Sequence, residues 1–111
     1  MEYEVNNEDK YTVISLKGDV DLHFSPTARK QILKYLGDKN NVLVDLSGVE
    51  YIDSSGVASL VEGYQLAKTN SLVFGLLKTS EAAQHVLALA RLDKIFPMYE
   101  SVADCVTRNP G

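Results

Sequence analysis

Alternating apolar and polar positions begin the chain and predict two strands joined as a hairpin. The apolar positions fall in residues 3–5 and 11–16, on either side of the polar segment 6–10. Apolar residues at every second position are typical of a strand, and a short polar stretch between two such runs predicts a hairpin. Residues 18–21 contain a glycine and two aspartates, and they predict a turn that leads the chain out of the sheet.

The next segment has the residue types of a helix start and a helix end. Ser25 is followed by Pro26, and this pair predicts a serine hydroxyl that caps the helix and a proline in its first turn. Gly37 predicts the end of the helix, because glycine is favoured where a helix stops. We therefore expect a helix over residues 25–37.

Beyond residue 40 the hydrophobic spacing switches repeatedly between strand and helix values. The predicted elements are a strand at 42–46, a helix from about 54, a strand at 71–77, a helix from about 80, a short edge strand within 95–99 and a helix from 101. Such alternation predicts a sheet that is parallel in its later part and covered by helices. The expected fold is α/β, with a mixed sheet of four to five strands, about four helices and a single domain over residues 1–111.

Composition and charge argue against several classes of function. With 111 residues, 45% apolar and 23% charged, the chain has the make-up of one globular domain. Its net charge of -4 argues against a nucleic-acid partner, which would need a basic surface. No apolar run approaches the roughly 20 residues that cross a bilayer, and residues 1–4 lack the features of a signal peptide. We expect a cytoplasmic protein without direct membrane insertion, whose single Cys105 forms no internal disulfide.

Residues 53–56, Asp-Ser-Ser-Gly, lie where the strand pattern ends and a helical pattern begins at Val57. One interpretation is a plain helix cap, for which replacing Ser54 by alanine would cost about 0.5–2 kcal/mol. The other is a phosphorylation site, because free backbone N–H groups and the helix dipole favour an anion at a helix start. A phosphoserine would add about two negative charges beside Asp53 and Asp21 without refolding the domain. Local chemistry alone favours the plain cap, because serine, aspartate and glycine are common residues at helix starts, and keeps the phosphorylation site as the alternative.

The sequence offers no conventional catalytic or metal-binding set beside this junction. It lacks Cys-x-x-Cys spacing and phosphate-binding glycine loops. Ser54, His23 and Asp21 are the residue types of a hydrolase triad, but the Gly-x-Ser-x-Gly turn of such enzymes is missing. A receiver-type alternative would place a phosphate on Asp53 and a magnesium ion on Asp19 and Asp21. We expect no enzyme activity, no metal and no cofactor of the chain's own.

Residues 42–57, Val-Leu-Val-Asp-Leu-Ser-Gly-Val-Glu-Tyr-Ile-Asp-Ser-Ser-Gly-Val, resemble the anti-sigma-factor antagonists of the STAS domain family. The segment 18–22, Gly-Asp-Val-Asp-Leu, is similar to the family's Gly-Glu-hydrophobic-Asp segment, and Pro26 and Arg29 stand where many members have the same residues. Phe24 departs from the pattern, because many members carry threonine or another small residue there. The resemblance extends over nearly the whole chain and implies a single STAS-like domain.

The resemblance implies a partner-switching function. In this family the unphosphorylated antagonist binds an anti-sigma factor that is also a serine kinase of the histidine-kinase-like ATPase fold, and this binding frees the sigma factor. The kinase uses ATP to phosphorylate the antagonist, and a PP2C-type phosphatase removes the phosphate. Carried over to this chain, the acceptor is Ser54, with Ser55 as the alternative. The implied partner-binding residues are Asp21, His23, Asp53, Ser55, Gly56 and Val57.

Two other functions are compatible with the same family. A STAS subunit of a membrane transport complex would never be phosphorylated, and a partner-switching regulator could control a process other than sigma-factor activity. The adjacent hydroxyls of Ser54 and Ser55 favour the phosphorylation switch, because a purely structural subunit does not need an acceptor hydroxyl.

Overall fold

The computed structural model describes residues 1–109 and contains, in that range, a five-stranded sheet and four helices. The first strand is antiparallel to the second, and the remaining neighbours are parallel. The predicted mixed α/β sheet is therefore confirmed. The strands lie side by side in chain order: β1 (Glu2–Glu8), β2 (Tyr11–Val20), β3 (Asn41–Ile52), β4 (Phe74–Leu77) and β5 (Met98–Tyr99).

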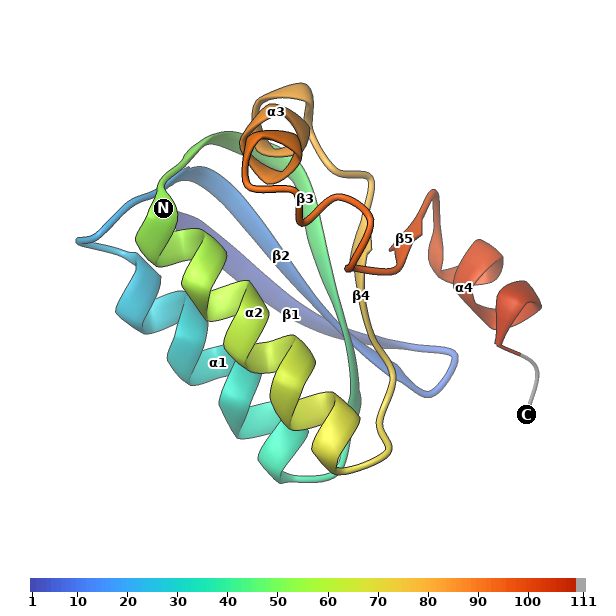
Figure 1. Cartoon of the computed structure of the whole chain (residues 1–111). Coiled ribbons are helices and arrows are strands. Elements are labelled where there is room, and N and C mark those ends of the chain that lie inside the picture. Colours follow the sequence, from blue (N-terminus) through green and yellow to red (C-terminus); the bar gives the residue numbers. More distant parts are fainter. Residues whose placement is uncertain (110–111) are drawn as a thin grey trace.

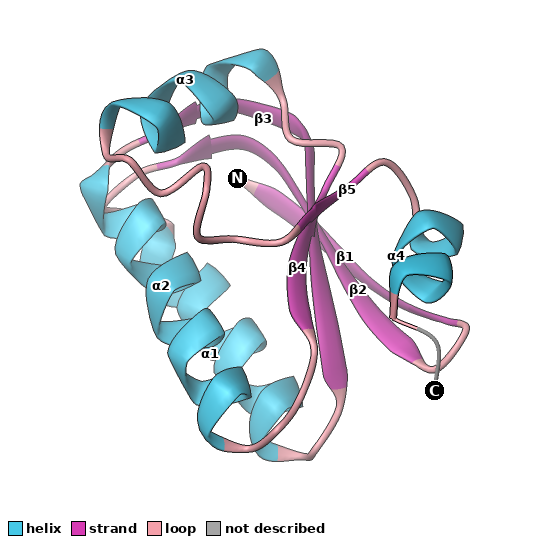
Figure 2. Cartoon of the chain, turned by 45° about the vertical axis from the view of Figure 1, so that its right-hand side comes forward, coloured by secondary structure: helices cyan, strands magenta, loops and turns pink. Residues whose placement is uncertain are grey.

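Helices lie on both faces of the sheet. One face is covered by α1 (Ser25–Gly37), α2 (Ser54–Thr69) and α3 (Glu81–Leu89), and α1 and α2 run side by side along it (Figure 1). The short helix α4 (Val102–Arg108) lies on the other face, so that the sheet separates it from α1 and α2 (Figure 2). No helix within residues 1–109 is both long and apolar enough to span a bilayer.

Two apolar layers follow from the alternation of side chains along the central strands. In β2, Ile14 and Leu16 pack with the residues of α1, α2 and α3, whereas Tyr11 and Val13 pack with those of α4. Residues 42–44 of β3 are fully buried, because this strand has a neighbour on each side and helices over both faces. The central strands thereby provide the rigid base from which the connecting loops project.

The predicted hairpin forms, but the strands are longer and the turn is shorter than expected. Only Asp9 and Lys10 separate β1 from β2, and both have positive φ values, 48° and 73°. A two-residue turn with positive φ at both positions matches the twist of paired strands. The polar residues 6–8, predicted as loop, belong to β1 because an exposed edge strand tolerates polar side chains.

Two further predicted boundaries are wrong because pairing with β3 decides them. Residues 18–20, predicted to leave the sheet, continue β2 and pair with β3 up to the match of Val20 with Ile52. Residues 71–73, predicted as strand, precede β4, because the ladder between β3 and β4 begins at the match of Val42 with Phe74. Strand length depends here on the partner strand rather than on local composition.

Serine caps explain why the last two helices begin close to the predicted positions. The Ser80 hydroxyl accepts a hydrogen bond from the Ala83 N–H at 3.2 Å at the start of α3. The Ser101 hydroxyl accepts one from the Asp104 N–H at 3.0 Å at the start of α4. Both bonds span three residues, which makes such starts recognisable in a sequence.

Candidate functional site

The carboxyl ends of β2 and β3 bring together two loops that are distant in the chain. Val20 and Ile52 are partners in the parallel ladder, so the chain leaves both strands at the same edge of the sheet. The Asp53 N–H donates a hydrogen bond to the Val20 carbonyl at 3.3 Å and ties the two exits together. This edge contains the loop 21–24 and the start of α2, and we refer to it as the candidate site.

Asp53 caps α2, with extended backbone angles of φ -103° and ψ -174°. Its Oδ1 accepts hydrogen bonds from the backbone N–H groups of Ser55 at 2.9 Å and Gly56 at 3.2 Å. The same oxygen accepts the Ser55 hydroxyl at 2.5 Å. Helix capping by this motif is therefore performed by Asp53, whereas Ser54, expected as a possible cap, is the first helical residue.

The second carboxylate oxygen of Asp53 reaches the other loop. Asp53 Oδ2 accepts a hydrogen bond from the Leu22 N–H at 3.0 Å, although the two residues are 31 positions apart. One carboxylate thus orders the start of α2 and the loop after β2 simultaneously. Separation along the chain explains why sequence reasoning did not find this bond.

These hydrogen bonds lower the pKa of Asp53 from its usual value. The largest cause is the bond from the Ser55 hydroxyl, and the N–H groups of Gly56, Ser55 and Leu22 act in the same direction. Partial desolvation opposes them but is outweighed. Donated hydrogen bonds stabilise the ionised carboxylate, so Asp53 is a charged acceptor at neutral pH.

Acid is expected to weaken the stabilisation that Asp53 provides. Because its folded pKa lies below its unfolded pKa, the contribution is complete above the unfolded value, about 3.9 for aspartate, and is lost as the pH falls through the folded value. Wild type should be more stable than Asp53→Asn at pH 7, and the gap should narrow below pH 4. Urea unfolding midpoints of both proteins between pH 7 and pH 3 test this, and a gap independent of pH would contradict it.

Asp21 closes the loop 21–24 on itself. Its Oδ1 accepts hydrogen bonds from the N–H groups of His23 at 3.0 Å and Phe24 at 3.2 Å. Its backbone carbonyl accepts the N–H of Ser25 at 2.7 Å. The expectation that the Ser25 hydroxyl caps α1 is wrong: Phe24 occupies the cap position without a side-chain hydrogen bond, and Ser25 is buried in the first turn.

The two candidate acceptor hydroxyls lie in different environments. Ser54 is exposed at the first position of α2, and no hydrogen bond to its hydroxyl is found within residues 1–109. Ser55 is half-buried, and its hydroxyl donates to Asp53. Ser54 is therefore accessible from solvent, whereas any reaction of the Ser55 hydroxyl requires breaking its bond to Asp53.

Gly56 and Val57 lie beneath the surface. A Cβ on Gly56 would come within 2.7 Å of both the Ile52 Cγ1 and the Val20 carbonyl oxygen. Val57 is 8% exposed and belongs to the main core. These two predicted partner-binding residues therefore shape the loop from below, whereas Asp21, His23, Asp53 and Ser55 are all at least partly exposed.

The arrangement does not resemble a hydrolase or receiver centre. His23 is exposed, and its ring packs edge-on against Phe24 at a centroid distance of 4.9 Å. Asp21 binds backbone N–H groups rather than the His23 ring. Within residues 1–109 no three His, Cys, Asp or Glu side chains are grouped as metal ligands, so Asp19, Asp21 and Asp53 do not form the acid cluster of the receiver alternative.

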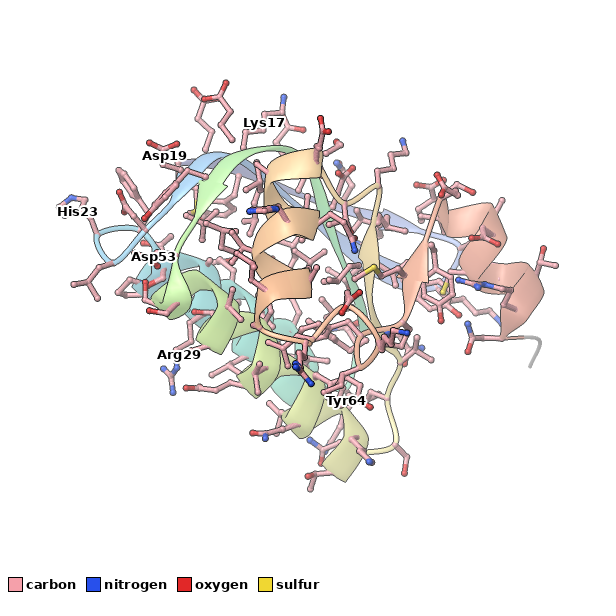
Figure 3. The ribbon with its side chains drawn as sticks, turned by 45° about the horizontal axis from the view of Figure 1, so that its top comes forward. Lys17, Asp19, His23, Arg29, Asp53 and Tyr64 are labelled. Atoms are coloured by element: carbon pink, nitrogen blue, oxygen red, sulfur yellow. The ribbon has the colours of Figure 1, made fainter. Side chains whose placement is uncertain are left out.

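Acidic side chains surround the candidate site. Asp19, His23 and Asp53 lie at the same end of the molecule (Figure 3). Lys17 precedes Asp19 on β2. Asp19 is exposed and is the ladder partner of Tyr51, while Asp21 is half-buried in the loop. A protein that docks here meets more negative than positive charge.

Sequence reasoning passed over Leu22 as a site residue. Its side chain is 74% exposed in the loop between Asp21 and His23. An apolar residue between two polar ones in a loop was the available signal, but exposed leucines are common in proteins. Only the structure shows that Leu22 adjoins Asp53.

Comparison with known proteins relates the chain and its fold to one family. The family model of the STAS domain matches residues 2–105. Anti-sigma-F factor antagonist RsfB of Mycobacterium tuberculosis is 27% identical over 104 residues, which is 93% of this chain and 84% of that protein. The crystal structure of an anti-sigma factor antagonist from Mycobacterium paratuberculosis superposes with a TM-score of 0.82 at 28% identity and covers 96% of this chain and 92% of that one.

A more distant similarity concerns the fold alone. The Bacillus cell fate determinant SpoIIAA in its phosphorylated form superposes with a TM-score of 0.75 at 18% identity, covering 97% of this chain and 99% of that one. The matched STAS domain model extends from the first residue of β1 into α4 and includes both loops of the candidate site. The chain therefore belongs to the STAS domain family.

Proposed function

We propose that this STAS domain is an anti-sigma factor antagonist whose binding to an anti-sigma factor is switched off by phosphorylation of Ser54. The names of RsfB and of the Mycobacterium paratuberculosis protein support the antagonist role. The observation that carries the switch is the contrast between an exposed Ser54 and a Ser55 whose hydroxyl is bound to Asp53. A phosphate on Ser54 would lie at the centre of the candidate site.

Electrostatics explains how such a phosphate would act without refolding the domain. It would add about 1.5–2 negative charges at neutral pH next to the carboxylate of Asp53. The N–H groups of Ser55 and Gly56, which would otherwise attract the phosphate, are already occupied by Asp53. The phosphate therefore remains at the surface, where it repels an approaching partner and leaves the helix start intact.

The anti-sigma factor in this proposal is also the kinase. It has the histidine-kinase-like ATPase fold, brings its own ATP and modifies Ser54, and a PP2C-type phosphatase restores the binding form. The STAS domain itself acts by binding rather than by catalysis and uses no cofactor. Asp21, His23 and Asp53 form the exposed part of its docking surface.

Affinity capture from the native host tests the proposal. Wild type, Ser54→Ala and Ser54→Asp serve as baits, captured proteins are identified by mass spectrometry, and binding is then measured with purified proteins. We expect wild type and Ser54→Ala to retain an anti-sigma factor and Ser54→Asp to lose it. Ser54→Asn is the matched control, because it has nearly the shape of the aspartate without its charge.

Three results would contradict the proposal. A membrane transporter held equally by all baits would identify the domain as a transport subunit. A retained regulator that controls no sigma factor would show partner switching in another process. Equal affinity of Ser54→Asp and Ser54→Asn for a captured anti-sigma factor would show that charge at this position does not control binding.

A further inference from the structure

Leu22 exposes an apolar side chain from a loop that several hydrogen bonds hold in place. Its side chain is 74% exposed, while its backbone N–H is bound to Asp53 Oδ2 at 3.0 Å. The next two N–H groups, those of His23 and Phe24, are bound to Asp21 Oδ1. The bond to Asp53 therefore fixes the Leu22 backbone relative to the start of α2, and the bonds to Asp21 order the two residues that follow it.

Packing below the loop adds to this order. Phe24 is half-buried, and the ring of His23 packs edge-on against it at 4.9 Å. Ser25, the following residue, is buried and donates its N–H to the Asp21 carbonyl at 2.7 Å. Because the loop backbone is already ordered, burial of Leu22 by a partner costs little backbone conformational freedom, which favours tight binding.

We propose that Leu22 is the apolar anchor of the docking surface, and that the anti-sigma factor receives it in an apolar pocket bordered by basic side chains. This inference rests on the proposed function. Interfaces derive most of their affinity from a few buried side chains surrounded by polar groups. Here the neighbouring charged groups are the carboxylates of Asp21 and Asp53, which line the same shallow surface as Leu22, so charge complementarity requires lysine or arginine on the partner.

Asp53 is the positioning residue of this anchor. The carboxylate that holds the Leu22 N–H also binds the first N–H groups of α2, next to the hydroxyl of Ser54. A phosphate on Ser54 is repelled by the same carboxylate, which keeps its bonds to these N–H groups. Phosphorylation therefore places new negative charge beside the anchor and leaves in place the hydrogen bond that positions it.

The domain alone tests the link between Asp53 and Leu22. In a pH titration followed by nuclear magnetic resonance, the Leu22 amide proton of wild type should shift upfield as Asp53 becomes protonated. The Asp53→Asn variant should show no such titration. A Leu22 amide that does not respond to acid in wild type, or that titrates equally in Asp53→Asn, would overturn the positioning role.

The purified anti-sigma factor retained by Ser54→Ala tests the anchor itself. Leu22→Ala should weaken binding by about 10- to 100-fold, as expected when a leucine loses its burial in an interface, and Leu22→Met should restore most of the affinity. Leu89→Ala is the matched control, because Leu89 is 73% exposed on α3. Thermal unfolding of each variant confirms that the fold is unchanged.

The outcomes separate the anchor from the switch. Leu22→Ala binding within twofold of wild type, or an equal loss in Leu89→Ala, would overturn the assignment of Leu22 even if Ser54→Asp still abolishes binding. Capture of no anti-sigma factor by any bait would instead refute the proposed function, and the anchor proposal with it. An anchor effect with no difference between Ser54→Asp and Ser54→Asn would refute only the phosphorylation switch.

Discussion

Replacing Ser54 by alanine is expected to abolish phosphorylation of the domain, whereas replacing Ser55 by alanine should leave one phosphate per molecule. The Ser54 hydroxyl faces solvent at the start of α2, and that of Ser55 is bound to Asp53 at 2.5 Å. Incubation of each variant with the captured kinase and ATP, followed by intact-mass measurement, determines the stoichiometry. A modification that persists fully in Ser54→Ala and disappears in Ser55→Ala would place the acceptor at Ser55.

The structure also predicts that Ser54→Ala removes the acceptor hydroxyl with little effect on the stability of the domain. Asp53, not Ser54, caps α2, so the loss of about 0.5–2 kcal/mol expected for a removed cap does not apply. We expect the free energy of unfolding to change by no more than about 0.5 kcal/mol, as for an ordinary surface substitution. A phosphate released from wild type by hydroxylamine would point instead to an acyl phosphate on Asp53, as in the receiver alternative.

Replacing Gly56 by alanine is expected to destabilise the domain by about 1–3 kcal/mol, the usual range for overpacking a core. The added Cβ would lie 2.7 Å from the Ile52 Cγ1 and 2.7 Å from the Val20 carbonyl oxygen. The carbonyl belongs to β2 and also accepts the Asp53 N–H at 3.3 Å, so it cannot move without disturbing the site. This clash outweighs the gain of about 1 kcal/mol that alanine brings to a helix.

Gly37→Ala provides the matched control for Gly56→Ala. Gly37 is the last residue of α1, and a Cβ placed on it meets no atom within 4 Å among the described residues. Alanine there should be neutral or stabilise the domain by up to about 1 kcal/mol. Urea unfolding of both variants measures the difference, and equal stabilities would show that α2 does not pack as closely on β2 and β3 as described.

Local rules predicted those features of the fold that depend on neighbours in the chain. The starts of α3 and α4 follow from serine hydroxyls that bind N–H groups three residues ahead. The start of α2 follows in the same way from Asp53. The end of β2 and the start of β4 were predicted less well, because their ladders with β3 set them. Pairing across strands adds information that no single segment contains.

The sequence by itself determined the order of strands and helices, the family and the Asp-Ser-Ser-Gly junction, because all of these reside in short contiguous segments. Only the tertiary structure decided that Ser55 rather than Ser54 is bound to Asp53 through its hydroxyl, that a side chain at position 56 would clash, and that the loop 21–24 adjoins Ser54. These features depend on β2 and β3 ending side by side. That arrangement brings the Leu22 N–H to 3.0 Å from Asp53 Oδ2, although the two residues are 31 positions apart in the chain. Hydrogen bonds and close packing between such distant segments form only when the chain has folded.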